Sequence, residues 1–254
     1  MAGRLEGRVC VITGAASGIG AESARLFREE GATVVGVDLN PGSEGQLAIE
    51  ADVTDEEQVA NLYRQVRDEL GRVDVLFNNA GINPNDDTTV TETPLDAWQR
   101  VQDVNVRSVF LCCKHGIPHL LDNDPPHRGS VVNTASFVAV MGAAVSQISY
   151  TASKGAVLSL SRELGVEFAD RGVRVNALCP GPVNTPLLAE LFAKDPEKAQ
   201  KRLVHVPMGR FGEAREIAQA AAFLASDDSS FITATTFMVD GGISGAYLTP
   251  GQAG

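Results

Sequence analysis

Short apolar runs rich in β-branched residues alternate with longer amphipathic segments along the chain. This alternation is typical of repeated strand–helix–strand units that build a parallel sheet. Most of the runs lack a polar alternation, as expected for strands that helices cover on both faces. The predicted strands are 9–13, 33–37, 47–51, 73–78, 130–134, 173–178 and 236–239, and the predicted helices are 18–30, 55–70, 95–121, 150–171 and 213–225.

Local signals mark some helix ends and the extent of the fold. Gly31 follows the first predicted helix, in the position just past a C-terminus that glycine favours. Thr54 precedes an acidic run, so we predict it as the N-cap of the second helix. With no repeat and no long linker, residues 1–254 are predicted to form one domain, a doubly wound Rossmann-type α/β fold. Its sheet should be largely parallel and seven-stranded, with helices on both faces. We expect the glycine-rich tail, 244–254, to be mobile.

The charge and the N-terminus exclude several classes of partner. The chain of 254 residues has a formal net charge of −11 and a pI near 4.8, so its field repels phosphate backbones and anionic lipid. We therefore expect no nucleic-acid and no membrane partner. The first apolar run, 9–12, is too short for a signal peptide or a membrane span, which predicts a cytoplasmic protein.

Metal and disulfide chemistry are not indicated. The four cysteines are scattered without a C-x-x-C pair and are predicted to be reduced, acting as small buried hydrophobes. His115 and His119 stand one helical turn apart, but no H-E-x-x-H pattern is present and Pro118 lies between them. We predict no metal site.

The turn after the first predicted strand has the composition of a phosphate-binding loop. Residues 13–20 read TGAASGIG, with glycines at 14, 18 and 20 between a strand and a helix. Such a turn lets a pyrophosphate approach the backbone at the positive end of the helix. The spacing is G-x-x-x-G-x-G and not G-x-G-x-x-G, and on this turn alone a plain strand-to-helix connection is equally well supported.

Asp38 favours the nucleotide interpretation. It ends the second predicted strand, close to the distance of about 20 residues at which an acidic side chain meets the adenosine ribose hydroxyls. A carboxylate there would repel a 2′-phosphate, and neither Ser17 nor Leu39 supplies a compensating cation. NAD is therefore predicted in preference to NADP.

Tyr150 and Lys154 are candidate catalytic residues because positions i and i+4 share one helix face. Lowering a phenol pKa from about 10 to about 7 requires roughly 4 kcal/mol. A unit charge about 5 Å away supplies roughly 3.3 kcal/mol at an effective dielectric near 20. Taken alone, however, such a pair is more often a solvated helix face.

Further motifs change that balance. TGAASGIG, the run Asn78-Asn79-Ala80-Gly81, Asn105, Ser136, YTASK and Pro180-Gly181 follow one another along the chain. In these motifs and their order, residues 5–242 resemble the short-chain dehydrogenase/reductase family. The resemblance implies that Tyr150 exchanges a proton with the substrate oxygen, while Lys154 lowers the pKa of Tyr150 and holds the nicotinamide ribose. It implies that Ser136 hydrogen-bonds the same oxygen and that Asn105 positions a water between Lys154 and solvent. Without it, Ser136 would be an ordinary turn serine and Asn105 a mid-helix residue without function.

The resemblance also implies the cofactor contacts. The glycine turn would hold the pyrophosphate, residues 52–53 the adenine, the NNAG run the dinucleotide, and residues 180–185 the nicotinamide carboxamide. The predicted contacts are Gly14, Ser17, Gly18, Ile19, Gly20, Asp38, Leu39, Asp52, Val53, Asn79, Ala80, Gly81, Tyr150, Lys154, Pro180, Gly181, Val183 and Thr185.

These observations predict an oxidoreductase that interconverts a secondary alcohol and a ketone on a small molecule with NAD(H). A 3-oxoacyl-thioester (acyl-carrier-protein) reductase is the alternative, and a non-catalytic nucleotide sensor is a third reading. The family usually forms tetramers through the helices that carry Asn105 and Tyr150, which implies a homotetramer. The substrate stays open among sugars, steroids, hydroxy acids and secondary alcohols.

Two departures from the family pattern are visible. Ala234 stands where relatives usually have glycine, which puts a local turn in doubt. Ser136 and Tyr150 are 14 positions apart, about one more than is usual, so the intervening loop is expected to bulge into the substrate pocket. Residues 187–192 could form an apolar lid or core, and the basic residues within 194–202 a solvated face or a contact for an acidic substrate.

Overall fold

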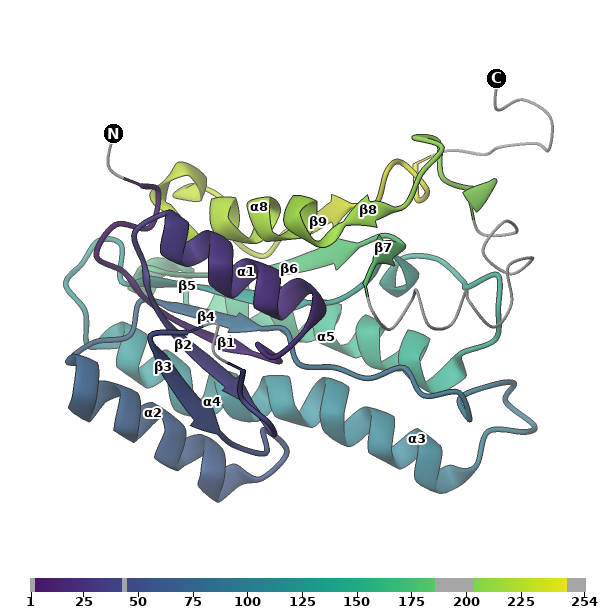
Figure 1. Cartoon of the computed structure of the whole chain (residues 1–254), viewed down its shortest axis with the longest axis horizontal. Helices are drawn as coiled ribbons and strands as arrows, with labels where there is room; N and C mark the ends of the chain where they lie inside the picture. The colour runs from purple at the N-terminus through teal and green to yellow at the C-terminus, as the bar shows by residue number, and fades with distance from the viewer. Residues whose placement is uncertain (1–2, 43–44, 186–202, 246–254) are drawn as a thin grey trace.

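A parallel sheet runs through the centre of the computed structural model, which describes residues 3–42, 45–185 and 203–245 (Figure 1). Within these residues, seven strands pair in the order β3-β2-β1-β4-β5-β6-β9, and every neighbouring pair is parallel. This confirms the predicted fold class. The strands are β1 (Val9–Thr13), β2 (Thr33–Asp38), β3 (Leu47–Glu50), β4 (Val75–Asn78), β5 (Gly129–Thr134), β6 (Val173–Pro180) and β9 (Thr236–Val239).

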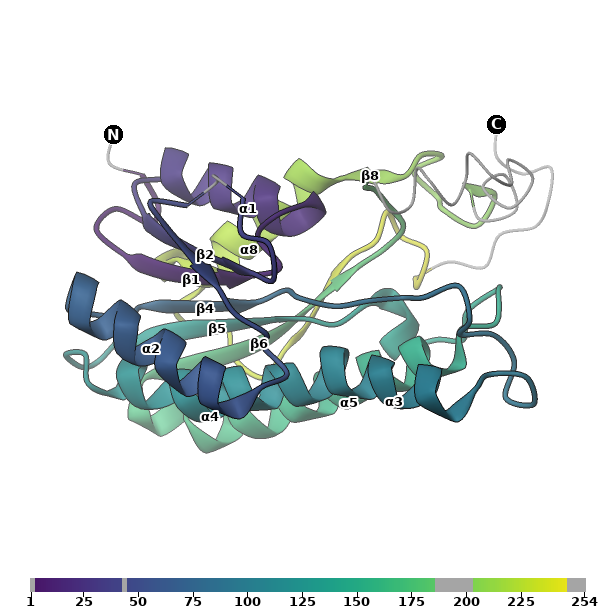
Figure 2. The same ribbon diagram turned by 60° about the horizontal axis from the view of Figure 1, so that its bottom comes forward.

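Helices cover both faces of the sheet, as the unbroken apolar strands require. Figure 2 shows α1 and α8 on one face and α2, α3, α4 and α5 on the other. Two buried hydrophobic clusters fill the two interfaces. The helices are α1 (Gly18–Glu29), α2 (Glu56–Leu70), α3 (Leu95–Gln102), α4 (Ser108–Leu121), α5 (Ile148–Glu167) and α8 (Ala214–Ala225).

The strand order reverses between β1 and β4, which are neighbours in the sheet. Chain connections leave such a switch point in opposite directions, so a crevice opens beyond the carboxyl ends of the two strands. The glycine turn follows β1 and the NNAG run closes β4. The topology therefore brings both motifs to the same crevice.

Several local predictions need correction. Thr54 is not the N-cap of α2, because the Asp55 carboxylate accepts the Gln58 N–H at 3.0 Å. The predicted helix 95–121 is interrupted by a π-helical turn, η1 (Asp103–Arg107). The predicted helix 150–171 is α5, which begins at Ile148 and ends at Glu167, and a separate short 3₁₀ turn follows at Ala169–Arg171. Gly31 does follow α1 with a positive φ of 92°, as predicted.

One small element was not predicted. Strands β7 (Val183–Asn184) and β8 (Gly212–Glu213) pair in parallel and tie the segment after β6 to the start of α8. Two residues per strand are too few to show a hydrophobic period. The expected lid at 187–192, the basic run within 194–202 and most of the tail, 246–254, lie outside the described residues.

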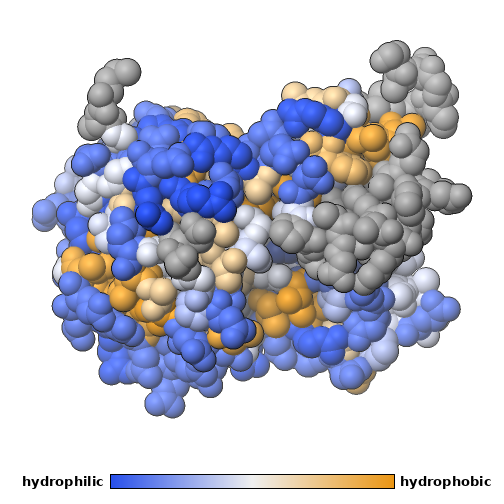
Figure 3. Space-filling model, viewed as in Figure 1, coloured by the Kyte–Doolittle hydropathy of each residue, from blue (hydrophilic) through white to orange (hydrophobic). Residues whose placement is uncertain are grey.

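The surface and the core agree with the composition. The face in Figure 3 is mostly hydrophilic, with hydrophobic side chains gathered in a few places. All four cysteines are free and buried, as predicted. Among the described helices, none combines the length and the apolar character needed to cross a membrane.

Candidate active site

A cavity of roughly 1160 Å³ opens beyond the carboxyl ends of the sheet strands. It is lined by nearly all the residues predicted for the site. The two exceptions are Gly20 in α1 and Asn105 in η1, which do not line the cavity. The predicted residues that line it are Gly14, Ser17, Gly18, Ile19, Asp38, Leu39, Asp52, Val53, Asn79, Ala80, Gly81, Ser136, Tyr150, Lys154, Pro180, Gly181, Val183 and Thr185.

The glycine turn is shaped by backbone conformation and close packing. Gly14 and Gly18 have φ values of 67° and 55°, which disfavour residues with a Cβ. A Cβ on Gly20 would lie 2.0 Å from the Gly14 carbonyl oxygen. The Ser17 side chain does not cap α1, and the helix bonds begin with the Ala21 N–H donating to the Ser17 carbonyl. The preceding amides have no partner within the helix, so its positive end is suited to a pyrophosphate.

Asp38 lies against this turn. Its carboxylate accepts the Ala16 N–H at 3.1 Å, which brings the end of β2 next to the loop after β1. Lys154 is the only lysine or arginine among the described residues that line the cavity. Its contact is on β5, three strands away from β2, so it cannot offset the Asp38 charge. Among the described residues that line the cavity, no lysine or arginine therefore offsets the charge of the Asp38 carboxylate.

Lys154 is the buried cation of the site. Its Nζ donates to the Thr134 carbonyl at 2.8 Å, and the residue is 3% exposed. Burial lowers the pKa of Lys154 to about 8. Nζ lies 5.5 Å from the centroid of the Tyr150 ring, so the predicted cation does stand beside the phenol. Gly81 leaves room for it, because a Cβ there would lie 3.3 Å from Nζ.

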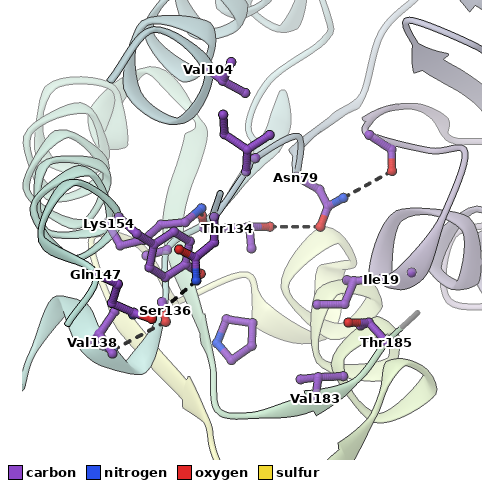
Figure 4. A pocket seen from close by; sticks show the side chains of 18 of the residues that line it. Ile19, Asn79, Val104, Thr134, Ser136, Val138, Gln147, Lys154, Val183 and Thr185 are labelled. Atoms are coloured by element: carbon purple, nitrogen blue, oxygen red, sulfur yellow. Dashed lines mark hydrogen bonds between the residues drawn. The ribbon is translucent and has the colours of Figure 1, made fainter. Parts of the chain in front are cut away.

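Asn79 links the glycine turn to the strand that holds Lys154. Its Nδ2 donates to the Thr13 carbonyl at 3.2 Å. Its Oδ1 accepts from Thr134 Oγ1 at 3.4 Å, a bond that Figure 4 shows as a dashed line between the two residues. Its own N–H donates to Thr13 Oγ1 at 3.0 Å. The two ends of the cavity therefore share one hydrogen-bonded bridge across β1, β4 and β5.

Ser136 follows β5 at the wall of the cavity. Its Oγ accepts the Val138 N–H at 3.4 Å and caps the short helix η2 (Phe137–Ala139). A hydroxyl that accepts in this way still has its own hydrogen to donate. Because Ser136 lines the cavity, this hydrogen can be donated to a substrate bound there.

Asn105 does not line the cavity, but its side chain connects two of the segments that do. Its Oδ1 accepts the Ile82 N–H at 2.8 Å, and its Nδ2 donates to the Ile82 carbonyl at 2.9 Å and to Ser153 Oγ at 3.0 Å. The side chain is fully buried. Its amide thus joins the loop after β4 to the helix that carries Tyr150 and Lys154.

Sequence reasoning missed Asp87. This carboxylate lines the cavity and accepts the backbone N–H groups of Ser149 and Tyr150 at 2.9 and 2.8 Å. The sequence offers no signal for it, because the poor N-cap at Gln147 becomes apparent only once the structure shows that α5 begins at Ile148. Even then, a missing cap does not indicate which distant residue supplies it.

The loop between Ser136 and Tyr150 forms much of the remaining wall, as its length predicted. Gln147 accepts a hydrogen bond from Asn83 at 3.3 Å, and His205 also lines the cavity. The loop residues that line the cavity are Phe137, Val138, Met141, Gly142, Ala143, Ala144, Val145, Ser146 and Gln147.

A doubly wound parallel sheet, a glycine turn at its switch point and a tyrosine–lysine pair beside a serine define the class of nicotinamide-dependent oxidoreductases. A family model described as enoyl-(acyl carrier protein) reductase matches residues 14–244. The chain belongs to the short-chain dehydrogenase/reductase family.

Similar proteins differ widely in substrate. The chain is 39% identical to the 3-oxoacyl-(acyl-carrier-protein) reductase of Thermotoga maritima, over 94% of this chain and 99% of that protein. It is 39% identical to meso-2,3-butanediol dehydrogenase of Serratia marcescens, over 94% and 95% of the two chains. The structure of aldohexose dehydrogenase from Thermoplasma acidophilum superposes with a TM-score of 0.86 at 35% identity, covering 97% of this chain and 98% of that one. This chain is accordingly an oxidoreductase that acts on CH–OH groups.

Proposed function

We propose that this protein interconverts a secondary alcohol and a ketone with NAD(H), using Tyr150 as the general acid and base. The observation that carries the proposal is the buried Lys154 ammonium, 5.5 Å from the Tyr150 ring centroid. A cation at this distance stabilises the phenolate form of Tyr150 by charge attraction.

The residues would handle the proton while the nicotinamide, when bound, accepts or supplies the hydride. In oxidation, the Tyr150 phenolate takes the proton of the substrate hydroxyl as the hydride leaves the carbon that bears this hydroxyl. The Ser136 hydroxyl donates a hydrogen bond to that oxygen and orients it. Reduction runs the same steps backwards, with the Tyr150 proton passing to the carbonyl oxygen.

NAD is proposed in preference to NADP. The support is the Asp38 carboxylate beside the glycine turn, together with the lack of a lysine or arginine near it among the described residues that line the cavity. A 2′-phosphate at this position would face a like charge without compensation.

A second candidate is the reduction of a 3-oxoacyl thioester on a carrier protein. The 39% identity to a reductase of that name over almost the whole chain supports it. A small 3-oxoacyl thioester can be assayed beside the alcohols, and a kcat/KM more than about 100-fold above that of every alcohol would favour this second function.

The test is the absorbance of reduced nicotinamide, with NAD and with NADP over a panel of secondary alcohols, polyols, hydroxy acids and hydroxysteroids, and with NADH and with NADPH for a 3-oxoacyl thioester. Turnover with NAD and a loss of about 10²- to 10⁴-fold in kcat for Tyr150→Phe, with NAD affinity kept, are expected. Unchanged turnover in Tyr150→Phe would contradict the role given to this residue. NAD binding without turnover of any panel member would favour the nucleotide-sensor alternative.

Assembly and location complete the proposal. A homotetramer is expected from membership of the family, and light scattering should give a mass four times the 26.8 kDa of the chain. A monomer would contradict it. The cytoplasmic location stays a prediction, which cell fractionation can test.

A further inference from the structure

The first turn of α5, which carries Tyr150, is capped by a segment far away in the sequence. A helix leaves its first N–H groups without partners inside the helix, and a local side chain usually satisfies one of them. In α5 the Gln147 side chain forms no such bond. The Ser149 N–H instead donates to Asp87 Oδ1 at 2.9 Å, and the Tyr150 N–H donates to Asp87 Oδ2 at 2.8 Å. The Ile148 N–H donates to the neighbouring carbonyl, that of Thr88, at 3.3 Å.

This cap requires a carboxylate to be buried. Asp87 is 4% exposed, and a buried carboxylate is stable only when hydrogen bonds or charges replace its water. Both oxygens are used on adjacent amides, and the negative charge lies at the positive end of α5. The two bonds therefore fix the position and the rotation of the first turn, and with them the point from which the Tyr150 side chain leaves the backbone.

The loop that carries Asp87 is itself held at both ends. At its start, Ile82 is clamped by Asn105, which also donates to Ser153 in α5. At its end, the Asp87 carboxylate holds the first turn of α5 through the Ser149 and Tyr150 N–H groups, and the Asp87 N–H closes a turn within the loop by donating to the Pro84 carbonyl at 3.2 Å. Residues 82–85, 87 and 88 line the cavity, so this loop is part of the wall that a substrate would meet. Both anchors connect that wall to the helix of Tyr150.

We propose that Asp87 is a positioning residue for Tyr150. It holds the backbone of this proton donor in a fixed position relative to the loop that a substrate would meet. This rests on the proposed function, in which Tyr150 transfers the proton. The competing explanation is a cap that only stabilises the fold. The two differ in kinetics, because a misplaced proton donor slows the chemical step, whereas a lost cap lowers the stability alone.

The experiment compares Asp87→Ala and Asp87→Asn with wild type, using NAD and the best substrate of the panel above. Asp87→Ala is expected to lower kcat by about 10- to 100-fold, with KM and the NAD dissociation constant changed less than about threefold. Asp87→Asn keeps one acceptor oxygen for one of the two amides, so its kcat should fall between the other two. It also serves as the folded variant if Asp87→Ala does not fold.

Two controls separate positioning from stability. Asp55 caps α2 by accepting the Gln58 N–H and does not itself line the cavity, although its neighbour Thr54 does, so Asp55→Ala should lower the melting temperature while kcat at saturating NAD stays within about twofold. In a Tyr150→Phe background, Asp87→Ala should cause less than about a twofold further loss, because the residue acts through Tyr150.

The outcomes are distinct. A kcat for Asp87→Ala within twofold of wild type, or a full further loss in the Tyr150→Phe background, would overturn the positioning role and leave the proposed function intact. Full turnover of Tyr150→Phe would reject the proposed function itself.

Discussion

The two ends of the cavity achieve their shape by different means. At the end proposed for adenosine and pyrophosphate, the wall is mostly backbone, with positive φ at Gly14 and Gly18 and no space for a side chain at Gly20. At the catalytic end, buried side chains such as Lys154 and Asn105 bond to backbone groups of other segments. The first end is therefore sensitive to added atoms, and the second to polar atoms that are removed or left unpaired.

This difference explains why local sequence patterns predict one end of the cavity better than the other. A backbone turn is encoded by neighbouring residues, so its glycines are read together. A bond such as that between Asp87 and the Tyr150 N–H joins residues 63 positions apart, and no local pattern marks the pair. The following predictions test whether the two ends do respond to opposite kinds of change.

An added methyl group at the cofactor end should have the largest effect. In Gly20→Ala, the new Cβ would lie 2.0 Å from the Gly14 carbonyl oxygen, so the turn must shift. We expect NAD affinity to fall by at least about 100-fold, equivalent to about 3 kcal/mol, in a calorimetric titration. Gly71→Ala is the control: unlike Gly20, this glycine has a positive φ, but a Cβ there meets no atom within 4 Å. It should reduce stability without changing NAD affinity, and equal affinity losses in both variants would refute the local explanation.

At the catalytic end, removing the buried charge should change stability in a pH-dependent way. Burial lowers the pKa of Lys154 from 10.5 to about 8, so the folded protein loses this proton near pH 8 while the unfolded chain keeps it to about 10.5. Between these values the unfolded state binds more protons, and wild-type stability rises with pH. Relative to Lys154→Met, wild type should therefore gain about 3 kcal/mol between about pH 7 and about pH 10.5 in urea unfolding without dinucleotide.

The exposed Lys114 provides the matched control. It pairs with Glu56 on the surface, so Lys114→Met should differ from wild type by a nearly constant amount, within about 0.5 kcal/mol, over the same pH range. If the difference in unfolding free energy between wild type and Lys154→Met did not depend on pH, burial would not destabilise the charged form of Lys154.

A smaller effect is expected from the charge at the cofactor end. Asp38→Asn removes the carboxylate proposed to bind ribose and to repel a 2′-phosphate. The ratio of kcat/KM with NAD to that with NADP should fall by about 10- to 100-fold, the value of one hydrogen bond to a charged group. Glu50 is the register partner of Asp38 on β3 but does not line the cavity, so Glu50→Gln should leave the ratio unchanged. Equal shifts in both variants would point to the overall field of the protein.

The smallest effect is expected at a residue with a strained backbone that lies outside both ends of the cavity. Ala234 has a φ of 56° and is the only residue other than glycine with a positive φ in the described part of the chain. Ala234→Gly should raise the free energy of unfolding by about 1 kcal/mol, because glycine adopts this conformation without a Cβ penalty. Ala156→Gly, at an exposed position of α5, should lower it by about the same amount. Calorimetric melting of both variants checks the opposite signs, and a loss of stability in Ala234→Gly would contradict the assignment of strain.

The sequence was sufficient for the sheet, most helices and the glycine turn because each depends on contiguous residues. The seven predicted strands all appear, since their apolar runs must be buried between helices. Tyr150 and Lys154 were also predictable, because a separation of four residues brings their side chains together on any helix. The π-helical turn at Asn105 and the pairing of β7 with β8 were not, since they are imposed by packing.

By itself, then, the sequence determined the fold class and the chemical types at the crevice. Only the tertiary structure decided how these groups are held: Lys154 on the Thr134 carbonyl, Asn105 on both backbone groups of Ile82, and Asp87 on the first turn of α5. The physical reason is that secondary structure follows the period of nearby side chains. A buried polar group, by contrast, takes whichever partner the packing of distant segments brings within hydrogen-bonding distance.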